Sequence, residues 1–159
     1  MRVIAIDPGY DRLGVAVMEL HNGSEQLLYS GCIETDKATP LHERLRVVGD
    51  SFTSLLHTHH PDTLAIETIF FNKNQKTAIG VAQARGILLY LAQVHECAVY
   101  EFGPQEIKIA VTGYGKSDKR AVFEMVKRLI INAPTSALDD EYDAIAVGIT
   151  CLAQYGRTR

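Results

Sequence analysis

Four acidic residues that follow or begin apolar segments are the best candidates for chemistry in this 159-residue sequence. Asp7 follows the apolar run 3–6, and Glu67 follows the run 64–66. Asp140 and Asp143 are three residues apart, a spacing that places them on one face of a helix. Carboxylates held together repel one another unless a cation is present, and an oxygen-only ligand set selects Mg²⁺ or Mn²⁺ over zinc. Two such ions about 3.5–4 Å apart suit phosphodiester cleavage.

The same acids also have a structural explanation. Acidic side chains in the first turn of a helix interact favourably with the helix dipole, and Asp139 and Glu141 are expected to do only that. Acids at the ends of strands are ordinary as well. Spacing alone therefore leaves the nuclease and the structural explanation open.

The elements that would position these acids follow from the hydrophobic pattern. Strands are expected at 3–6, 14–18, 27–35, 64–66 and 99–102, with Asn22-Gly23 as a hairpin turn. Helices are expected at 41–55 (ending near Pro61), 76–96, 105–111, 119–131 and 140–155. This order predicts a single α/β domain over residues 1–159, in which a five-stranded mixed sheet of three antiparallel strands followed by parallel strands carries helices on both faces.

The helix expected at 76–96 is apolar around most of its circumference. We expect it to be buried on more than one side, and pairing with its own copy in a homodimer would bury the remaining apolar surface. Its most apolar stretch, residues 78–92, contains Gln83 and Arg85 and is expected to be too short to span a bilayer.

Composition is compatible with several partners. The formal net charge of −3 counts mildly against nucleic acid, but basic residues are concentrated in the segments 73–85 and 104–131. The cysteines Cys32, Cys97 and Cys151 lie far apart and indicate a reducing compartment. A strand pattern directly after Arg2 leaves no room for a signal peptide, so a cytoplasmic protein is expected. The histidines His57, His59 and His60 are expected to interact with the carboxyl end of the first helix rather than with a metal.

Five motifs resemble, in order and over almost the whole chain, those of the RuvC family of Holliday-junction resolvases, which have an RNase H-like fold. They read "IAIDPGYDRLGVAV", "AIETIFFNKN", "AQARG", "IKIAVTGYGKSDK" and "DDEYDAIAVG". The resemblance implies that Asp7, Glu67, Asp140 and Asp143 bind two Mg²⁺ ions, for which Mn²⁺ can substitute. The first helix position varies in type within the family, so Asp139 competes with Asp140 for that role.

The resemblance also implies roles for residues around the acids. The family's phenylalanine at the position of Phe70 stacks on a base near the crossover; Phe71 either shares that role or packs inward. Lys108 and Lys119 fall on positions beside the metal centre, where a lysine can neutralise charge on the phosphate. Gly113–Ser117 is expected to be a flexible loop facing DNA. The expected DNA contacts are Phe70, Phe71, Lys73, Lys76, Arg85 and Lys116.

The function expected from this resemblance is a structure-selective endodeoxyribonuclease that resolves four-way DNA junctions by paired symmetric nicks. Its expected partners are branched DNA, a second copy of the chain and a branch-migration complex of the RuvA and RuvB type. Two alternatives remain open: a related RNase H-like nuclease that processes ribosomal RNA precursors, and a junction-binding protein without catalysis.

Overall fold

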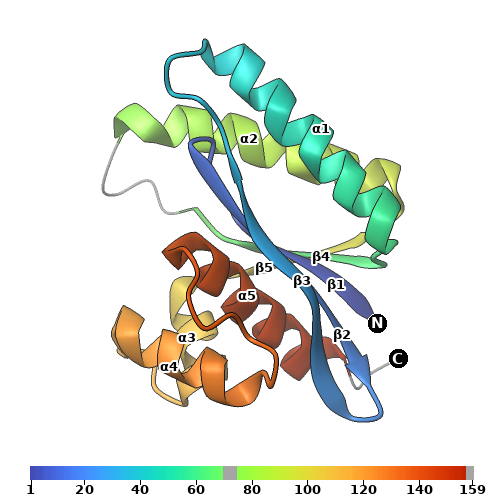
Figure 1. Ribbon diagram of the computed structural model, residues 1–159, viewed down its shortest axis with the longest axis vertical. Helices are drawn as coiled ribbons and strands as arrows, with labels where there is room; N and C mark the ends of the chain where they lie inside the picture. The colour runs from blue at the N-terminus through green and yellow to red at the C-terminus, as the bar shows by residue number, and fades with distance from the viewer. Residues whose placement is uncertain (70–74, 157–159) are drawn as a thin grey trace.

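Five strands form one mixed sheet in the computed structural model, which describes residues 1–69 and 75–156 (Figure 1). The strands are β1 (Arg2–Asp7), β2 (Arg12–His21), β3 (Ser24–Glu34), β4 (Thr63–Glu67) and β5 (Ala98–Phe102). Their order in the sheet is β3-β2-β1-β4-β5. The first three strands are antiparallel, whereas β1, β4 and β5 run parallel to one another. The predicted mixed sheet is therefore confirmed.

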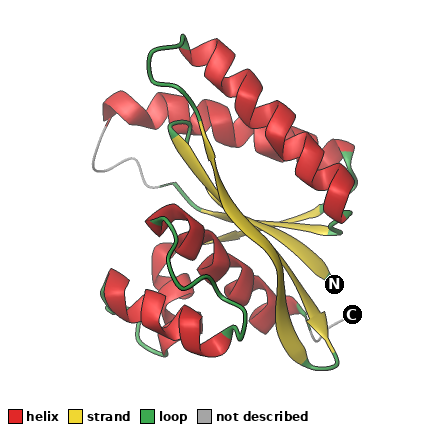
Figure 2. Cartoon of the chain, in the orientation of Figure 1, coloured by secondary structure: helices red, strands yellow, loops and turns green. Residues whose placement is uncertain are grey.

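Helices cover both faces of this sheet, as predicted (Figure 2). They are α1 (Leu41–His59), α2 (Gln75–Val94), α3 (Pro104–Thr112), α4 (Lys119–Leu129) and α5 (Asp139–Tyr155). Helices α1 and α2 lie on one face, and α3, α4 and α5 lie on the other.

Side-chain alternation along the strands separates two cores. Ile4 and Ile6 of β1 pack with Phe52 of α1 on one face of the sheet. Val3 and Ala5 belong to the core that contains α5. Because successive residues of a strand point to opposite faces, Asp7 continues the row of Val3 and Ala5 and faces the α5 side.

The hairpin between β2 and β3 forms at the predicted turn. Asn22 and Gly23 have φ values of 51° and 80°. Two successive residues with positive φ are typical of a type I′ turn, in which asparagine followed by glycine is the favoured pair.

Helix α1 ends at His59, near Pro61 as expected, and its C-cap His60 is left-handed and donates its backbone N–H to the Leu56 carbonyl. The ends of α2 and α4 differ from the sequence expectation. Helix α2 ends at Val94, and Glu96 just beyond it has a φ of 59°. Helix α4 ends at Leu129, because Ile130 is already extended.

Helix α2 buries one face only. Ala84, Leu88 and Ala92, spaced by four residues, are fully buried. Ile79 and Tyr90 on the opposite surface are each 68% exposed. The expectation of burial on more than one side is thus wrong for the single chain. Among the described residues, 77–94 form one helix that is long and apolar enough to cross a membrane by length and composition alone. The expectation that its apolar stretch is too short to span a bilayer was therefore wrong.

Candidate functional site

Two of the four acids end neighbouring strands at the same level. In the parallel pairing of β1 with β4, Ile6 is in register with Ile66, so Asp7 and Glu67 each extend the pair by one residue. Ala65, two residues before Glu67, belongs to the core on the α5 side. Asp7 and Glu67 therefore face α5 from adjacent strands.

The first turn of α5 brings the other two acids to this edge. Gly14 of β2 is in register with Asp7, and a Cβ atom built on Gly14 would lie 1.8 Å from the Asp140 carbonyl oxygen. The absence of a side chain at Gly14 therefore lets α5 approach the end of β1. Gly148 plays a similar part deeper in the core, since a Cβ atom there would lie 2.6 Å from the Met18 sulphur.

The acids of this turn point in different directions. The side chains of Asp140 and Asp143 are 24% and 27% exposed, whereas that of Asp139 is 64% exposed. Glu141 accepts a hydrogen bond of 2.6 Å from the Ser30 hydroxyl of β3. The geometry therefore places Asp140 rather than Asp139 beside Asp7.

Burial and neighbouring carboxylates shift the protonation of Asp7, Glu67 and Asp143. Burial, followed by the charges of Asp143, Glu67 and Asp140, raises the pKa of Asp7 to about 8. Burial and the charge of Asp143 raise the pKa of Glu67, and burial is also the main cause that raises the pKa of Asp143. Burial and nearby like charges both disfavour the ionised form of a carboxyl group, so Asp7, Glu67 and Asp143 are each easier to protonate than a free carboxyl.

Three cations border this acidic cluster. The Lys119 Nζ lies 2.9 Å from Asp143 Oδ2 and 3.4 Å from Asp139 Oδ2. Burial lowers the pKa of Lys119. The hydrogen bond that Lys119 donates to Asp143 and the negative charge of Asp143 outweigh this effect, so the pKa of Lys119 is raised. Burial raises the pKa of Glu67, and the charge of Lys108 opposes this rise. Arg12 Nε lies 3.0 Å from Asp140 Oδ2.

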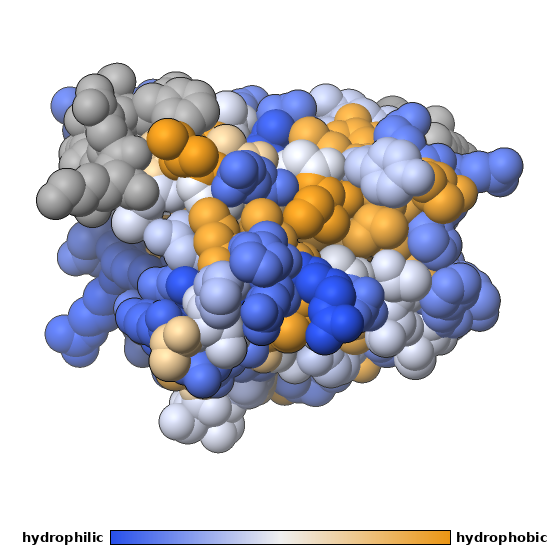
Figure 3. Space-filling view, turned by 90° about the horizontal axis from the view of Figure 1, so that it is seen from above, coloured by the Kyte–Doolittle hydropathy of each residue, from blue (hydrophilic) through white to orange (hydrophobic). Residues whose placement is uncertain are grey.

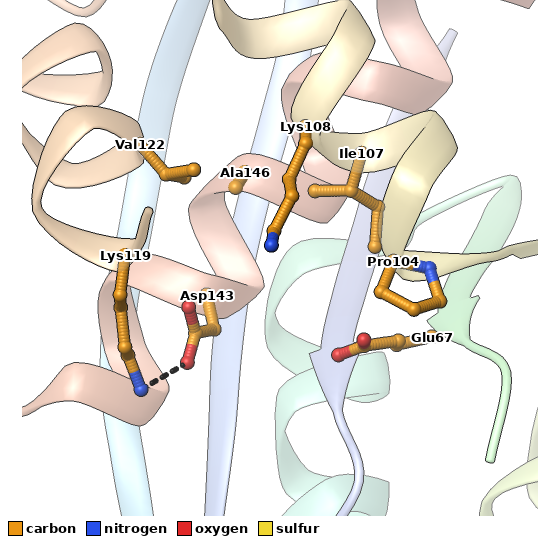
Figure 4. Close-up of a pocket in the computed structure, with 8 residues that line it drawn as sticks. All are labelled: Glu67, Pro104, Ile107, Lys108, Lys119, Val122, Asp143 and Ala146. Atoms are coloured by element: carbon orange, nitrogen blue, oxygen red, sulfur yellow. Dashed lines mark ion pairs between the residues drawn. The ribbon is translucent and has the colours of Figure 1, made fainter. Parts of the chain in front are cut away.

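A cavity of about 240 Å³ opens between the sheet edge and helices α3, α4 and α5 (Figure 4). Glu67, Lys108 and Asp143 point into it from three different elements, and Lys119 is ion-paired with Asp143 at its side. The other lining residues are Pro104, Ile107, Val122 and Ala146. Apolar side chains thus form one wall opposite a charged one, an arrangement that strengthens electrostatic interactions inside the cavity.

The donor set fits divalent cations, although the carboxylates are not drawn tightly together. Within residues 1–69 and 75–156, no three histidine, cysteine, aspartate or glutamate side chains are grouped closely enough to hold one ion as they stand. Mutual repulsion and the pairing of Asp140 with Arg12 and of Asp143 with Lys119 account for this spread.

One oxygen of the cluster is buried and ion-paired with Arg12 but has no hydrogen bond within the described residues. Asp140 Oδ2 is buried and has no hydrogen-bond partner in the described part of the chain; Arg12 is near it, but not in hydrogen-bonding geometry. A buried carboxylate oxygen without a hydrogen bond is costly unless a cation compensates it. Oxygen donors alone are the ligands that Mg²⁺ and Mn²⁺ prefer.

The expected DNA contacts are only partly described. Phe70, Phe71 and Lys73 lie outside the described residues, as does the side chain of Lys76. Lys116 is exposed in the segment between α3 and α4.

Arg85 is not a free surface cation. Its guanidinium forms an ion pair with Glu101 of β5, and its side chain is 19% exposed. For Arg85 to contact DNA, this pair within the fold would have to open or be shared.

Sequence reasoning missed two residues of the site. Arg12 was not distinguished from other surface arginines, because its partner Asp140 is remote in sequence. Gly14 was assigned to a strand, with no indication that α5 packs directly against it. Both depend on a contact between β2 and α5 that only the folded chain reveals.

Comparisons with known proteins agree with this geometry. A family model described as "Crossover junction endodeoxyribonuclease RuvC" matches residues 3–151. The curated protein of that name from Thermosipho melanesiensis is 43% identical over 153 residues, which cover 96% of this chain and 97% of the relative. Its counterpart from Thermotoga petrophila is 36% identical over 159 residues, covering 100% and 96% of the two chains.

Solved structures show the same fold. Thermus thermophilus RuvC superposes with a TM-score of 0.88 at 28% identity, covering 98% of this chain and 97% of the other. The T. thermophilus RuvC structure in complex with a Holliday junction substrate gives a TM-score of 0.90 at 30% identity, with coverages of 99% and 96%. The yeast mitochondrial Holliday junction resolvase Ydc2, at 12% identity and a TM-score of 0.68, shares the fold.

Proposed function

The chain belongs to the crossover junction endodeoxyribonuclease RuvC family, and we propose that it resolves four-way DNA junctions by hydrolysing two opposed phosphodiester bonds. The observation that carries this proposal is that the charges of Glu67, Asp140 and Asp143 all act on Asp7, while Glu67, Asp143 and Lys108 line one cavity. The complex of the T. thermophilus relative with a Holliday junction substrate supports the choice of substrate.

The four carboxylates are proposed to hold two Mg²⁺ ions, with Mn²⁺ as a substitute. Bound divalent ions in such sites lower the pKa of water and stabilise the leaving oxygen. Asp7 ends β1 and Glu67 ends β4, so rigid strands fix two of the proposed ligands, while Asp140 and Asp143 are fixed by a buried helix. Ligands on rigid elements keep their positions without a reorganisation cost.

The lysines are proposed to balance charge. Lys119 contacts Asp143 at 2.9 Å and opposes the rise in the pKa of Asp143 that burial causes. Lys108 points into the cavity beside Glu67, where its ammonium group would stabilise negative charge developing on a phosphate.

The DNA contacts are proposed on the family resemblance and on position. Lys116 and the cations of the 73–85 segment would bind phosphates, and Phe70, with or without Phe71, would stack on an unpaired base. Base stacking on an aromatic ring contributes about 1–3 kcal/mol per base. The branch-migration complex of the RuvA and RuvB type is proposed as a partner on family grounds alone.

A homodimer is proposed because two opposed strands need two sites and because α2 exposes an apolar surface. Ile79, Tyr90 and Val94 of α2 are 68%, 68% and 57% exposed. Figure 3, which views the molecule from the α1 and α2 side, shows apolar side chains open to solvent among polar ones. A two-fold axis across this surface would bury it and place two sites symmetrically. Sedimentation equilibrium that finds only monomer at micromolar concentration would contradict the dimer.

A reducing compartment such as the cytoplasm is proposed from the cysteines. Cys32, Cys97 and Cys151 are all free thiols in the structure. Cys97 and Cys151 are buried, and burial raises the pKa of both thiols, which makes them unreactive.

A substrate comparison tests the proposed function. Purified protein with Mg²⁺ is incubated with a synthetic four-way junction, a linear duplex of the same sequence and a structured RNA. We expect paired nicks in opposed strands of the junction, at a rate at least 100-fold above that on the duplex or the RNA. Faster cleavage of RNA would favour the ribosomal RNA alternative, and tight junction binding without nicks would favour a non-catalytic role.

A further inference from the structure

Arg44 is the one charged side chain that is buried among the described residues. It lies in α1 and is 7% exposed. A buried guanidinium is costly unless its donors are paired, so its surroundings are expected to be specific. Arg46, two residues later on the same helix, is exposed and provides a natural comparison.

The partners of Arg44 converge on one loop. Its Nη2 donates to the Tyr10 carbonyl oxygen at 3.3 Å and forms an ion pair with Asp11. Its guanidinium carbon lies 4.8 Å from the centre of the Tyr10 ring, a cation–π geometry. Its Nε donates to the Thr35 hydroxyl at 2.9 Å.

This loop, residues 8–11, joins the proposed ligand Asp7 to Arg12. Asp7 is the last residue of β1, and Arg12 begins β2 and contacts Asp140. The turn is tight, since a Cβ atom on Gly9 would lie 2.0 Å from the Arg12 carbonyl oxygen. A displacement of the loop would therefore move both ends, and with them the distance between Asp7 and the Arg12–Asp140 pair.

Two other elements hold the same loop. The Thr35 hydroxyl donates to the Tyr10 carbonyl oxygen, and the Thr35 N–H donates to the Asp11 carbonyl oxygen at 3.0 Å. On the other side, the Tyr10 ring packs on Gly80 of α2, where a Cβ atom would lie 2.6 Å from a ring carbon. Arg44 is the only one of these groups that contacts the loop backbone, the Asp11 carboxylate and the Tyr10 ring together.

We propose that Arg44 is a positioning residue for the carboxylate cluster: by clamping residues 8–11 it sets the separation of Asp7 and Asp140 that divalent-ion binding requires. This inference rests on the proposed metal-dependent function. A planar guanidinium can donate in several directions while stacking on a ring, whereas a lysine in its place supplies charge without that fork. Loss of Arg44 should therefore weaken metal binding and turnover more than junction binding, which depends on surfaces elsewhere.

The test compares Arg44→Met with Arg46→Met as the matched control. Mn²⁺ binding to the DNA-free protein is measured by the electron paramagnetic resonance signal of free Mn²⁺, and single-turnover cleavage and junction affinity are measured at a temperature where circular dichroism shows each variant folded. We expect Arg44→Met to lose at least fivefold in Mn²⁺ affinity and tenfold in cleavage rate, with junction Kd within twofold of wild type. Arg46→Met should change none of these.

Two further variants keep the proposal falsifiable if Arg44→Met does not fold. Thr35→Val removes the hydroxyl that links Arg44 to Tyr10, and Arg44→Lys keeps the charge; each should lower Mn²⁺ affinity at least twofold. Wild-type Mn²⁺ affinity and cleavage in a folded Arg44→Met, or in both of these variants, would overturn the proposal. Wild-type protein that binds Mn²⁺ but does not cut junctions would contradict the proposed function and leave the Mn²⁺ comparison to decide on Arg44. Wild-type protein that binds no Mn²⁺ would overturn both.

Discussion

The protonation of a single half-buried carboxyl, that of Asp7, links stability to function at the residue scale. Burial and three neighbouring carboxylates raise the pKa of Asp7 to about 8, far above its ordinary value of 3.8. Without a divalent ion the folded chain therefore holds a proton at Asp7 in neutral solution. A bound cation would replace that proton and stabilise the ionised form.

Asp7→Asn should stabilise the metal-free protein at high pH. The folded protein keeps the Asp7 proton up to a pH of about 8, whereas the unfolded chain releases it near 3.8, so the free energy of unfolding falls as the pH rises between these values. Asparagine removes this penalty, and we expect a gain of about 1–3 kcal/mol at pH 8 that vanishes towards pH 4. Urea unfolding in EDTA at both pH values measures it.

The exposed acid Asp139 provides the control for this prediction. Its side chain is 64% exposed and contacts Lys119, so Asp139→Asn should give no gain that grows with pH. If Asp7→Asn and wild type had equal stability at pH 8 in EDTA, the carboxylates would not share one desolvated space.

The contact between β2 and the start of α5 positions the site at the element scale. Gly14 lies in register with Asp7 and directly under the Asp140 carbonyl. The helix thus reaches the end of β1 only because β2 has no side chain at this position. The distance between the strand acids and the helix acids depends on this packing.

Gly14→Ala should separate the two halves of the site. The added carbon would lie 1.8 Å from a backbone oxygen, so the start of α5 must move. We expect a loss of about 1–3 kcal/mol in the free energy of unfolding and at least a tenfold slower junction cleavage. Gly49→Ala in α1 is the control, because its added carbon would lie 3.3 Å from the Ile87 Cγ2 methyl, a side-chain contact that a small shift relieves, and not against backbone. Equal cleavage by the two variants would show that this packing does not set the site.

Elements that depend on residues close together in the sequence could be predicted, and features that depend on distant contacts could not. The positions of the strands and the Asn22-Gly23 hairpin depend on local patterns and were predicted. The end of α2 was placed two residues too late, because the left-handed conformation of Glu96 is not evident in its sequence. The apolar circumference of α2 was also misinterpreted, since which part of it packs on the sheet depends on its orientation in the fold.

The same distinction applies to the site. Asp7 and Glu67 could be identified as candidates, because each directly follows an apolar strand. The pairings of Arg12 with Asp140 and of Arg44 with Asp11 could not, because each joins residues far apart in sequence and neither forms a local pattern. Long-range ion pairs of this kind require coordinates.

At the scale of the whole molecule, the two faces of the sheet have different tasks. The face with α3, α4 and α5 holds the acids and the cavity, while the face with α1 and α2 carries the exposed apolar surface proposed for dimerisation. The buried Arg44 connects the two, since it extends from α1 to the loop that follows Asp7.

Acids that are distant in the chain are proposed to bind, together, the divalent ions with which the protein hydrolyses DNA. The most direct test of this proposal is single-turnover cleavage of a synthetic four-way junction by wild type and Asp7→Asn, with Mg²⁺ or EDTA, alongside junction binding. The account predicts paired nicks by wild type with Mg²⁺ alone, and a loss of at least 1000-fold in Asp7→Asn with junction Kd within threefold. Cleavage by wild type in EDTA, or undiminished cleavage by Asp7→Asn, would contradict it.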